Sequence, residues 1–220
     1  MTDCDDTNRA VAVPDGTDHL VYAVADLEHG MDDIEKRLGV RPMPGGRHPA
    51  WGTHNALVSL GPTTYLEIIA PDPGLPAPSR GVLFDPEGGR EPRLATWVFN
   101  TEDIGKLAAL AKSAGLGLGA VQSGSRESSD GTVLSWRLTD PYAMPLDGAV
   151  PFLISWGDTP HPAGVAPRAG ELTSLVVEHP APARVREALD VLGANLVVRR
   201  GETFRLVAKI TGAAGEVELY

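Results

Sequence analysis

The chain has a single cysteine, fewer basic than acidic residues and no long apolar run. Its one cysteine, Cys4, has no partner for a disulfide within the chain, which indicates a reducing compartment such as the cytoplasm. Of the 220 residues, 19 are basic and 29 are acidic, and the net charge of -10 argues against nucleic-acid binding. No run of about 18 apolar residues is present, so we expect no membrane-spanning helix.

Common catalytic motifs are missing as well. The sequence has no Gly-x-Ser-x-Gly element, no phosphate-binding loop, no dinucleotide fingerprint and no paired-cysteine motif. These absences argue against a serine hydrolase, an NTPase and a dehydrogenase. What the chain does contain is 25 glycines and 19 prolines, which predict many turns between short strands.

Three segments share the order strand, helix and further strands, and together they predict an α+β fold. The segments cover residues 17–72, 93–157 and 171–220, and we interpret each one as a βαβββ module. Residues 1–16 are polar and acidic, and they are predicted to form a flexible leader rather than a signal peptide. Stretches rich in proline and glycine separate the modules.

The first module carries one histidine on its first strand, His19, and one glutamate on its last strand, Glu67. Each lies in an apolar run, where burial of an unpaired ionisable group is costly. A divalent metal bound by both would offset this cost, because imidazole and carboxylate groups are common metal ligands. Alternatively, Asp18 or a backbone carbonyl pairs with His19, and Arg47 or Arg137 pairs with Glu67.

The first module also matches a known sequence pattern. Its main parts are Asp18-His19-Leu20-Val21-Tyr22, Gly45-Gly46-Arg47-His48-Pro49 and Tyr65-Leu66-Glu67-Ile68-Ile69. In these residues the chain resembles the glyoxalase-like domain proteins of the vicinal-oxygen-chelate superfamily, which also contains glyoxalases, bleomycin-resistance proteins and dioxygenases. The resemblance implies that two modules pair into a cupped half-barrel of sheet, with helices outside and a pocket inside. We expect modules one and two to pair, and the third either to extend the sheet or to form a homodimer contact.

The resemblance further implies a divalent metal, with ligands from the first and last strands of both paired modules. His19 and Glu67 occupy these positions in the first module, whereas the second module has no ligand at the matching positions. A third ligand is therefore expected from elsewhere, and His54, which begins a neighbouring strand, is the best candidate. Nitrogen and oxygen ligation suits Zn, Fe, Mn, Ni or Co, and the sequence does not choose between them.

A second group of residues is suited to binding a substrate. Arginine offers a planar fork for a carboxylate, asparagine offers both a donor and an acceptor, and aromatic side chains offer a wall for an apolar body. On strands, however, aromatic residues most often belong to the core. Together these residues predict a small-molecule partner with an anionic group beside an apolar body. The predicted substrate-binding residues are Arg47, Asn55, Trp136, Arg137, Phe152, Trp156 and His161.

Two functions of different classes fit these residues. In the first, the chain is an enzyme in which a metal held by His19, Glu67 and His54 stabilises an enolate or enediolate, as in isomerase, lyase or dioxygenase chemistry. Glu67, His54 and His48 are then the candidates for moving the proton. In the second, the chain binds or sequesters a small molecule without a metal, as the drug-binding members of the superfamily do.

Overall fold

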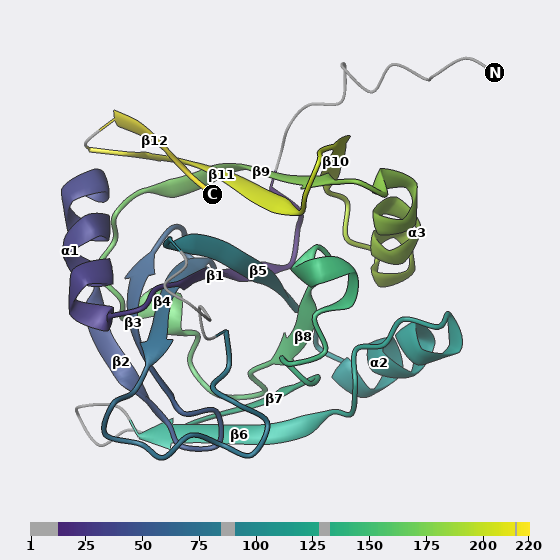
Figure 1. The fold of residues 1–220 in the computed structure, drawn as a ribbon, viewed down its shortest axis with the longest axis horizontal. Helices are drawn as coiled ribbons and strands as arrows, with labels where there is room; N and C mark the ends of the chain where they lie inside the picture. The colour runs from purple at the N-terminus through teal and green to yellow at the C-terminus, as the bar shows by residue number, and fades with distance from the viewer. Residues whose placement is uncertain (1–12, 85–90, 128–132, 214) are drawn as a thin grey trace.

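Strands make up most of the regular structure, and they form two separate sheets (Figure 1). The computed structural model describes residues 13–84, 91–127, 133–213 and 215–220. Most of the predicted leader, including Cys4, lies outside these residues. In chain order the elements are β1 (Thr17–Ala23), α1 (Leu27–Leu38), β2 (Met43–His48), β3 (Thr53–Ser59), β4 (Tyr65–Pro71), β5 (Arg93–Asn100), α2 (Ile104–Ser113), β6 (Gln122–Glu127), β7 (Val133–Leu138), the 3-10 turn η2 (Pro145–Gly148), β8 (Phe152–Ser155), the 3-10 turn η3 (Pro162–Gly164), β9 (Glu171–His179), α3 (Pro182–Leu192), β10 (Val197–Arg200), β11 (Arg205–Gly212) and β12 (Gly215–Leu219).

The first sheet has eight strands in the order β2-β3-β4-β1-β5-β8-β7-β6. β1 and β5 pair antiparallel at its centre, so the first two modules join there. Within each module the first strand pairs parallel with the last, β1 with β4 and β5 with β8. The sheet curls until the edge strands β2 and β6 approach each other, where Arg126 donates to the carbonyl oxygen of Gly45 at 2.7 Å. A curled sheet with helices outside confirms the predicted α+β fold class (Figure 1).

Helix α1 covers the outer face of the first module. Asp26 caps its start by accepting a hydrogen bond from the backbone N–H of His29, and Gly39 ends it with a left-handed φ of 76°. Its buried side chains recur at helical spacing, and Ile34 and Leu38 pack into the main core with residues of β3 and β4. The helix thereby holds these strands in place from outside the curl.

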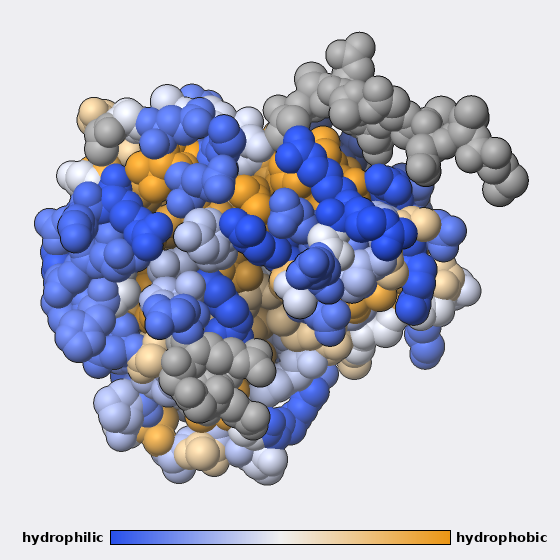
Figure 2. Space-filling view, turned by 45° about the horizontal axis from the view of Figure 1, so that its top comes forward, coloured by the Kyte–Doolittle hydropathy of each residue, from blue (hydrophilic) through white to orange (hydrophobic). Residues whose placement is uncertain are grey.

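One face of the molecule is largely polar. On the face shown in Figure 2, hydrophilic side chains predominate, and the apolar side chains gather in small patches between them. Within the described parts of the chain, no helix combines the length and the apolar character needed to cross a membrane.

The last part of the chain has the order strand, helix and three strands, but its strands pair differently from those of modules one and two. It forms a sheet with the order β10-β9-β11-β12, in which β9 runs parallel to β10 and antiparallel to β11. Its first strand therefore pairs with the second and third strands, instead of with the last strand as in modules one and two. This sheet does not extend the first one either, because it packs on the outer face of β1 and β5 (Figure 1).

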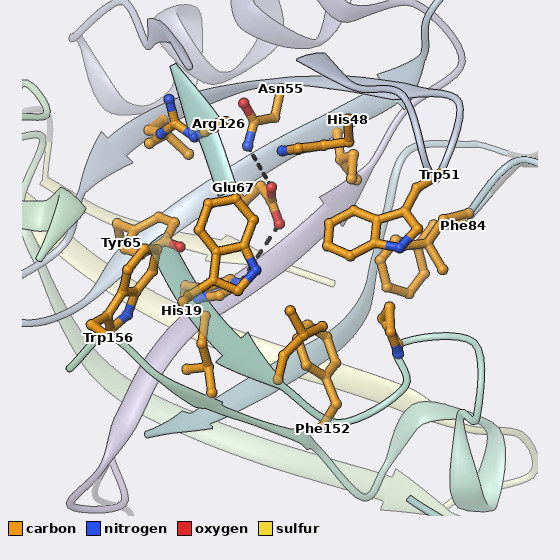
Figure 3. Close-up of a pocket in the computed structure, with 17 residues that line it drawn as sticks. His19, His48, Trp51, Asn55, Tyr65, Glu67, Phe84, Arg126, Phe152 and Trp156 are labelled. Carbon is orange, nitrogen blue, oxygen red and sulfur yellow. Dashed lines mark hydrogen bonds and ion pairs between the residues drawn. The ribbon is translucent and has the colours of Figure 1, made fainter. Parts of the chain in front are cut away.

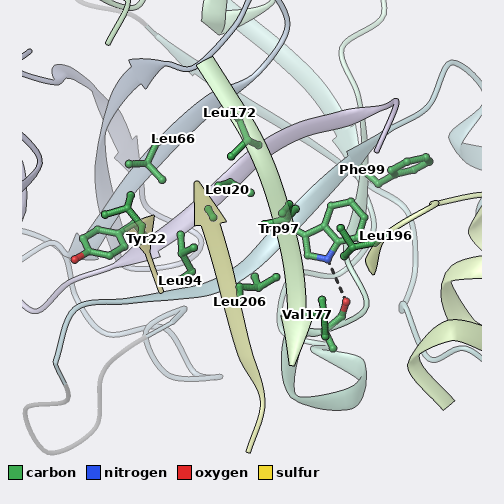
Figure 4. Packing of buried hydrophobic residues seen from close by; sticks show 14 of the residues in the cluster. Leu20, Tyr22, Leu66, Leu94, Trp97, Phe99, Leu172, Val177, Leu196 and Leu206 are labelled. Carbon is green, nitrogen blue, oxygen red and sulfur yellow. Dashed lines mark hydrogen bonds between the residues drawn. The ribbon is translucent and has the colours of Figure 1, made fainter. Parts of the chain in front are cut away.

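An apolar outer face on β1 and β5 explains this packing. Leu20, Leu94 and Trp97 are buried in a core that both sheets share. From the second sheet, Val177 and Leu206 belong to the same core and lie over these residues (Figure 4). Removing this apolar surface from water is the main driving force for joining the two sheets.

The segment that leads into the second sheet runs along the end of β3. The backbone N–H of Ser59 donates to the carbonyl of Pro167 at 2.8 Å, and the carbonyl of Ser59 accepts from Ala169 at 3.0 Å. These bonds tie the segment to the first module. They also hold η3 near that module, together with His161, which precedes η3.

The packing between the sheets predicts the cost of truncating a side chain within it. Leu206→Ala should lower the free energy of unfolding by about 2–5 kcal/mol, because the substitution removes buried methyl groups and leaves a cavity. Urea denaturation of both proteins measures the difference. Leu110→Ala is the matched control, because Leu110 is 52% exposed and its truncation should cost less than about 1 kcal/mol. Equal losses in the two variants would contradict the packing described here.

Candidate functional site

A cavity lies inside the curled first sheet, and both modules line it (Figure 3). The first module contributes most of its polar side chains, and the second contributes mainly aromatic and aliphatic ones. The cavity is lined by His19, His48, Trp51, Asn55, Leu57, Tyr65, Glu67, Ile69, Leu83, Phe84, Arg126, Trp136, Leu138, Pro141, Phe152, Ile154 and Trp156.

A fully buried carboxylate, Asp18, lies directly behind the cavity wall. It accepts four hydrogen bonds: one from His19 Nδ1 at 2.6 Å, one from Asn100 Nδ2 at 2.7 Å, one from Trp156 Nε1 at 2.9 Å and one from His161 Nε2 at 3.1 Å. Burial alone would raise the pKa of Asp18, but the hydrogen bonds from His161 and His19 outweigh it and hold that pKa well below its ordinary value. Asp18 is therefore a buried anion with its acceptor positions filled.

Asp18 also decides which nitrogen of His19 is free. A carboxylate only accepts hydrogen bonds, so Nδ1 of His19 carries a proton and Nε2 is the ring nitrogen that faces the cavity. Nε2 lies 3.7 Å from Oε2 of Glu67. Tyr65 stacks on the imidazole at 4.4 Å between ring centroids, which further fixes the ring plane. His19 thus pairs with Asp18 through Nδ1, which was one of the alternatives. It faces Glu67 through Nε2.

Glu67 is oriented by an amide. Asn55 Nδ2 donates to Oε1 of Glu67 at 2.5 Å, and Asn55 Oδ1 accepts from the backbone N–H of Gly46 at 2.9 Å. A Cβ on residue 45 would collide with Asn55 Oδ1, so glycine is needed at Gly45 for this arrangement. With Oε1 held in this way, Oε2 is the oxygen that faces His19.

His48 is buried in the cavity wall beside Trp51, with a ring distance of 5.2 Å. Its Nδ1 lies 3.1 Å from Thr53 Oγ1. Burial lowers the pKa of His48 to about 4, although the charge of Glu67 opposes the shift. The imidazole is therefore neutral at neutral pH.

The opposite side of the cavity is apolar and aromatic. Trp136, Phe152 and Trp156, the three aromatic residues predicted to form a wall, all line it. The ring centroids of Trp136 and Trp156 lie 5.7 Å apart. Phe152 and His19 meet edge to face, with 6.2 Å between their ring centroids. Gly124 makes room for this wall, because a Cβ there would lie 2.5 Å from Nε1 of Trp136.

Two arginines predicted to bind substrate lie elsewhere. Arg47 forms an ion pair with Asp72 at 2.5 Å, its side chain is 56% exposed, and it is not among the residues that line the cavity. Arg137 is exposed, because alternation along β7 turns Trp136 inward and Arg137 outward. Neither arginine pairs with Glu67, whose hydrogen bond comes from Asn55.

The structure does not bring two predicted histidines to the cavity surface. Successive residues of a strand face opposite sides, and Asn55 faces the cavity, so His54 faces the side covered by α1. His161 lies one layer behind the cavity, where it donates to Asp18. His54 is thus one residue away from a cavity-facing position of β3, and His161 lies behind the cavity wall without lining it.

Other lining residues were not predicted. Tyr65 could have been found, because it precedes Glu67 by two residues and therefore faces the same side of β4. Burial raises its pKa well above the ordinary value, so its hydroxyl is neutral. Arg126 lies in a polar stretch without a hydrophobic pattern, and Leu83 and Phe84 come from the segment after β4, so local sequence offered no signal for them.

The donors at the cavity fit a divalent metal in part. His19 and Glu67 face each other, and Asp18 holds the other nitrogen of His19, as a carboxylate often does for a metal-binding histidine. Within the described residues there is no group of three or more His, Cys, Asp or Glu side chains that could hold a metal ion. The site therefore offers two protein ligands, fewer than the three of typical catalytic zinc sites.

Comparisons with known proteins give one family and several solved structures. The family model described as "Glyoxalase-like domain" matches residues 17–193. A crystal structure of a hypothetical protein from Staphylococcus aureus superposes with a TM-score of 0.65 at 13% identity, over 93% of this chain and 98% of that chain. This similarity shows a shared fold.

Two epimerase structures are more distant. Methylmalonyl-CoA epimerase from Mycobacterium tuberculosis gives a TM-score of 0.43 at 18% identity, over 69% of this chain and 93% of its own. A variant of the Streptomyces coelicolor enzyme in complex with 2-nitronate-propionyl-CoA gives 0.42 at 16% identity, over 66% and 97%. The search of curated proteins found no match to the chain.

The hydrogen bonds to Asp18 predict a stability effect with a defined pH dependence. Asp18→Asn should lower the free energy of unfolding near neutral pH by about 1–3 kcal/mol, because an amide cannot accept from all four donors. Since the folded-state pKa of Asp18 is lowered, its contribution is complete above the ordinary value of 3.8 and is lost as the pH falls below it. The difference between the two proteins in urea denaturation should therefore shrink on acidification.

The control is Asp26→Asn, because asparagine caps a helix about as well as aspartate. A stability difference between wild type and Asp18→Asn that is the same at about pH 7 and about pH 3 would contradict the role given to this carboxylate.

Proposed function

The chain belongs to the glyoxalase-like domain family of the vicinal-oxygen-chelate superfamily, and from this premise we propose that its cavity is the active site of an enzyme acting on a small molecule. The observation that carries the proposal is the pair formed by His19 and Glu67. Nε2 of His19 and Oε2 of Glu67 face each other at 3.7 Å inside the cavity, and each side chain is held from behind, by Asp18 and Asn55 respectively. Such preorganised groups are typical of catalytic sites.

In this proposal His19 Nε2 and Glu67 Oε2 are the protein ligands of a divalent ion, for which Zn, Fe, Mn, Ni and Co are all suited to nitrogen and oxygen donors. A bound ion would act as a Lewis acid towards a substrate oxygen. Asp18 keeps His19 in the tautomer that a metal requires, and Asn55 leaves only one oxygen of Glu67 free. The cavity thus supplies an oriented pair of donors without rearrangement.

Proton transfer next to a carbonyl group is the reaction that these residues suit best. When Glu67 Oε2 binds the ion, the neutral ring of His48 remains in the cavity wall as a group that can accept a proton at neutral pH. The aromatic wall excludes water from the opposite side, which strengthens electrostatic interactions within the cavity. We therefore propose an isomerase, epimerase or lyase reaction.

A second function rests on a different observation. The described residues provide no third metal ligand, and Trp136, Phe152 and Trp156 offer a continuous apolar wall. Both features suit a protein that binds a small apolar molecule without a metal. In that case His19 and Glu67 orient the ligand by hydrogen bonds.

Metal content separates the two functions. Protein purified without an affinity tag and dialysed exhaustively should retain a stoichiometric divalent metal by elemental mass spectrometry. His19→Ala and Glu67→Gln should each lose it, because each removes one of two protein ligands. His54→Ala is the matched control and should keep the metal, because His54 faces the other side of β3.

Full metal content in His19→Ala and Glu67→Gln would contradict the metal proposal. No metal in the wild type, combined with thermal stabilisation by apolar ligands, would favour the binding protein instead.

A further inference from the structure

Arg126 brings a positive charge to the wall of the cavity. Among the described residues that line it, Arg126 is the only arginine or lysine, and Glu67 is the only carboxylate. Arg126 lies on the edge strand β6, opposite Leu134 of β7 in the register. Leu134 belongs to the core inside the curl, and paired residues share a face, so the Arg126 side chain is directed inward. Figure 3 shows it on the same side of the cavity as Asn55.

One guanidinium nitrogen of Arg126 is already engaged. Nη1 donates to the carbonyl oxygen of Gly45 at 2.7 Å, across the gap between β6 and β2. A guanidinium has five N–H donors in a planar fork. The bond to Gly45 orients this fork, and the described residues give Nε and Nη2 no further partner. As far as the described residues go, the site therefore contains an oriented cation whose remaining donors can reach a ligand.

The charge of Arg126 reaches the rest of the cavity. It opposes protonation of His48 and favours the ionised form of Tyr65, so its field acts on two other lining side chains. A ligand with a carboxylate would supply both the counter-charge and acceptors that match the fork.

We propose that Arg126 is the anion-recognition residue of this cavity, and that it selects small monocarboxylates whose apolar body lies against Trp136, Phe152 and Trp156. The carboxylate oxygens accept from the free N–H groups of Arg126. The inference deepens the proposed function, because it names the substrate class of the same cavity, and it rests on that function only in assuming that the cavity binds a small molecule. It requires no metal.

The test compares two probes that differ only in charge. Binding of 3-phenylpropanoate and of its amide, 3-phenylpropanamide, is measured by calorimetry on the full chain, before and after dialysis against a chelator. The wild type should bind the carboxylate about 10-fold or more tightly than the amide, since hydrogen bonds to charged groups carry this much discrimination. Arg126→Gln should lose this preference while its affinity for the amide stays the same. Arg126→Lys should keep part of it, because lysine is a point charge without a fork.

Arg137→Gln is the matched control. Arg137 lies on the neighbouring strand β7 but is exposed on the outer face, so its loss should leave both affinities unchanged. An equal loss of both probes in Arg126→Gln would assign Arg126 to closing the sheet and would overturn the proposal, as would an unchanged preference for the carboxylate.

The metal proposal fails independently of this one. If the carboxylate preference disappears on chelation but survives in Arg126→Gln, the ion is the anion receptor and the role of Arg126 is overturned. If it survives chelation and disappears in Arg126→Gln, the role of Arg126 stands whatever the metal content.

Discussion

The buried carboxylate of Asp18 is the interaction on which the site depends. A carboxylate without partners in this position would be strongly unfavourable, and four donors compensate it. The donors come from β1, from the end of β5, from the residue after β8 and from the segment before η3. One buried charge therefore fixes the cavity-facing histidine, His19, and one member of the aromatic wall, Trp156, relative to each other. A shift of either module would break hydrogen bonds to the same two oxygens.

The two modules are alike in strand pairing but unlike in chemistry. In both, the first strand pairs parallel with the last, which gives the curl its approximate symmetry. The first module places His19, Asn55 and Glu67 on the inner face, whereas β8 of the second places Phe152 and Ile154 there. A symmetric site would hold one ion at its centre with ligands from both sides. This cavity instead has a polar side suited to reactive groups and an apolar side suited to the body of a ligand.

Local patterns predicted what depends on strand alternation and on neighbouring residues. His19 and Glu67 meet, and Trp136 and Arg137 face opposite sides, as the period of two requires. Predictions of which side chains face the cavity failed in two situations. One is a shift of a single residue along a strand, and the other is an interaction with a partner distant in the sequence. His54 is one residue from a cavity-facing position, and Arg47 is drawn away by Asp72, 25 residues later. The pairing of the last four strands was not predicted, because strand order depends on which surfaces remain to be buried and not on the order of elements along the chain.

Closure of the sheet and orientation of the carboxylate pass through the same dipeptide. The carbonyl of Gly45 accepts from Arg126 of the opposite edge strand, and the next N–H, that of Gly46, donates to Asn55. Asn55 in turn donates to Glu67. These bonds form a continuous line from the second module to the carboxylate of Glu67, and a side chain at residue 45 would interrupt it by colliding with the Asn55 amide. Because hydrogen bonds in such a line polarise one another, closure of the sheet at Arg126 and orientation of Glu67 are parts of one network.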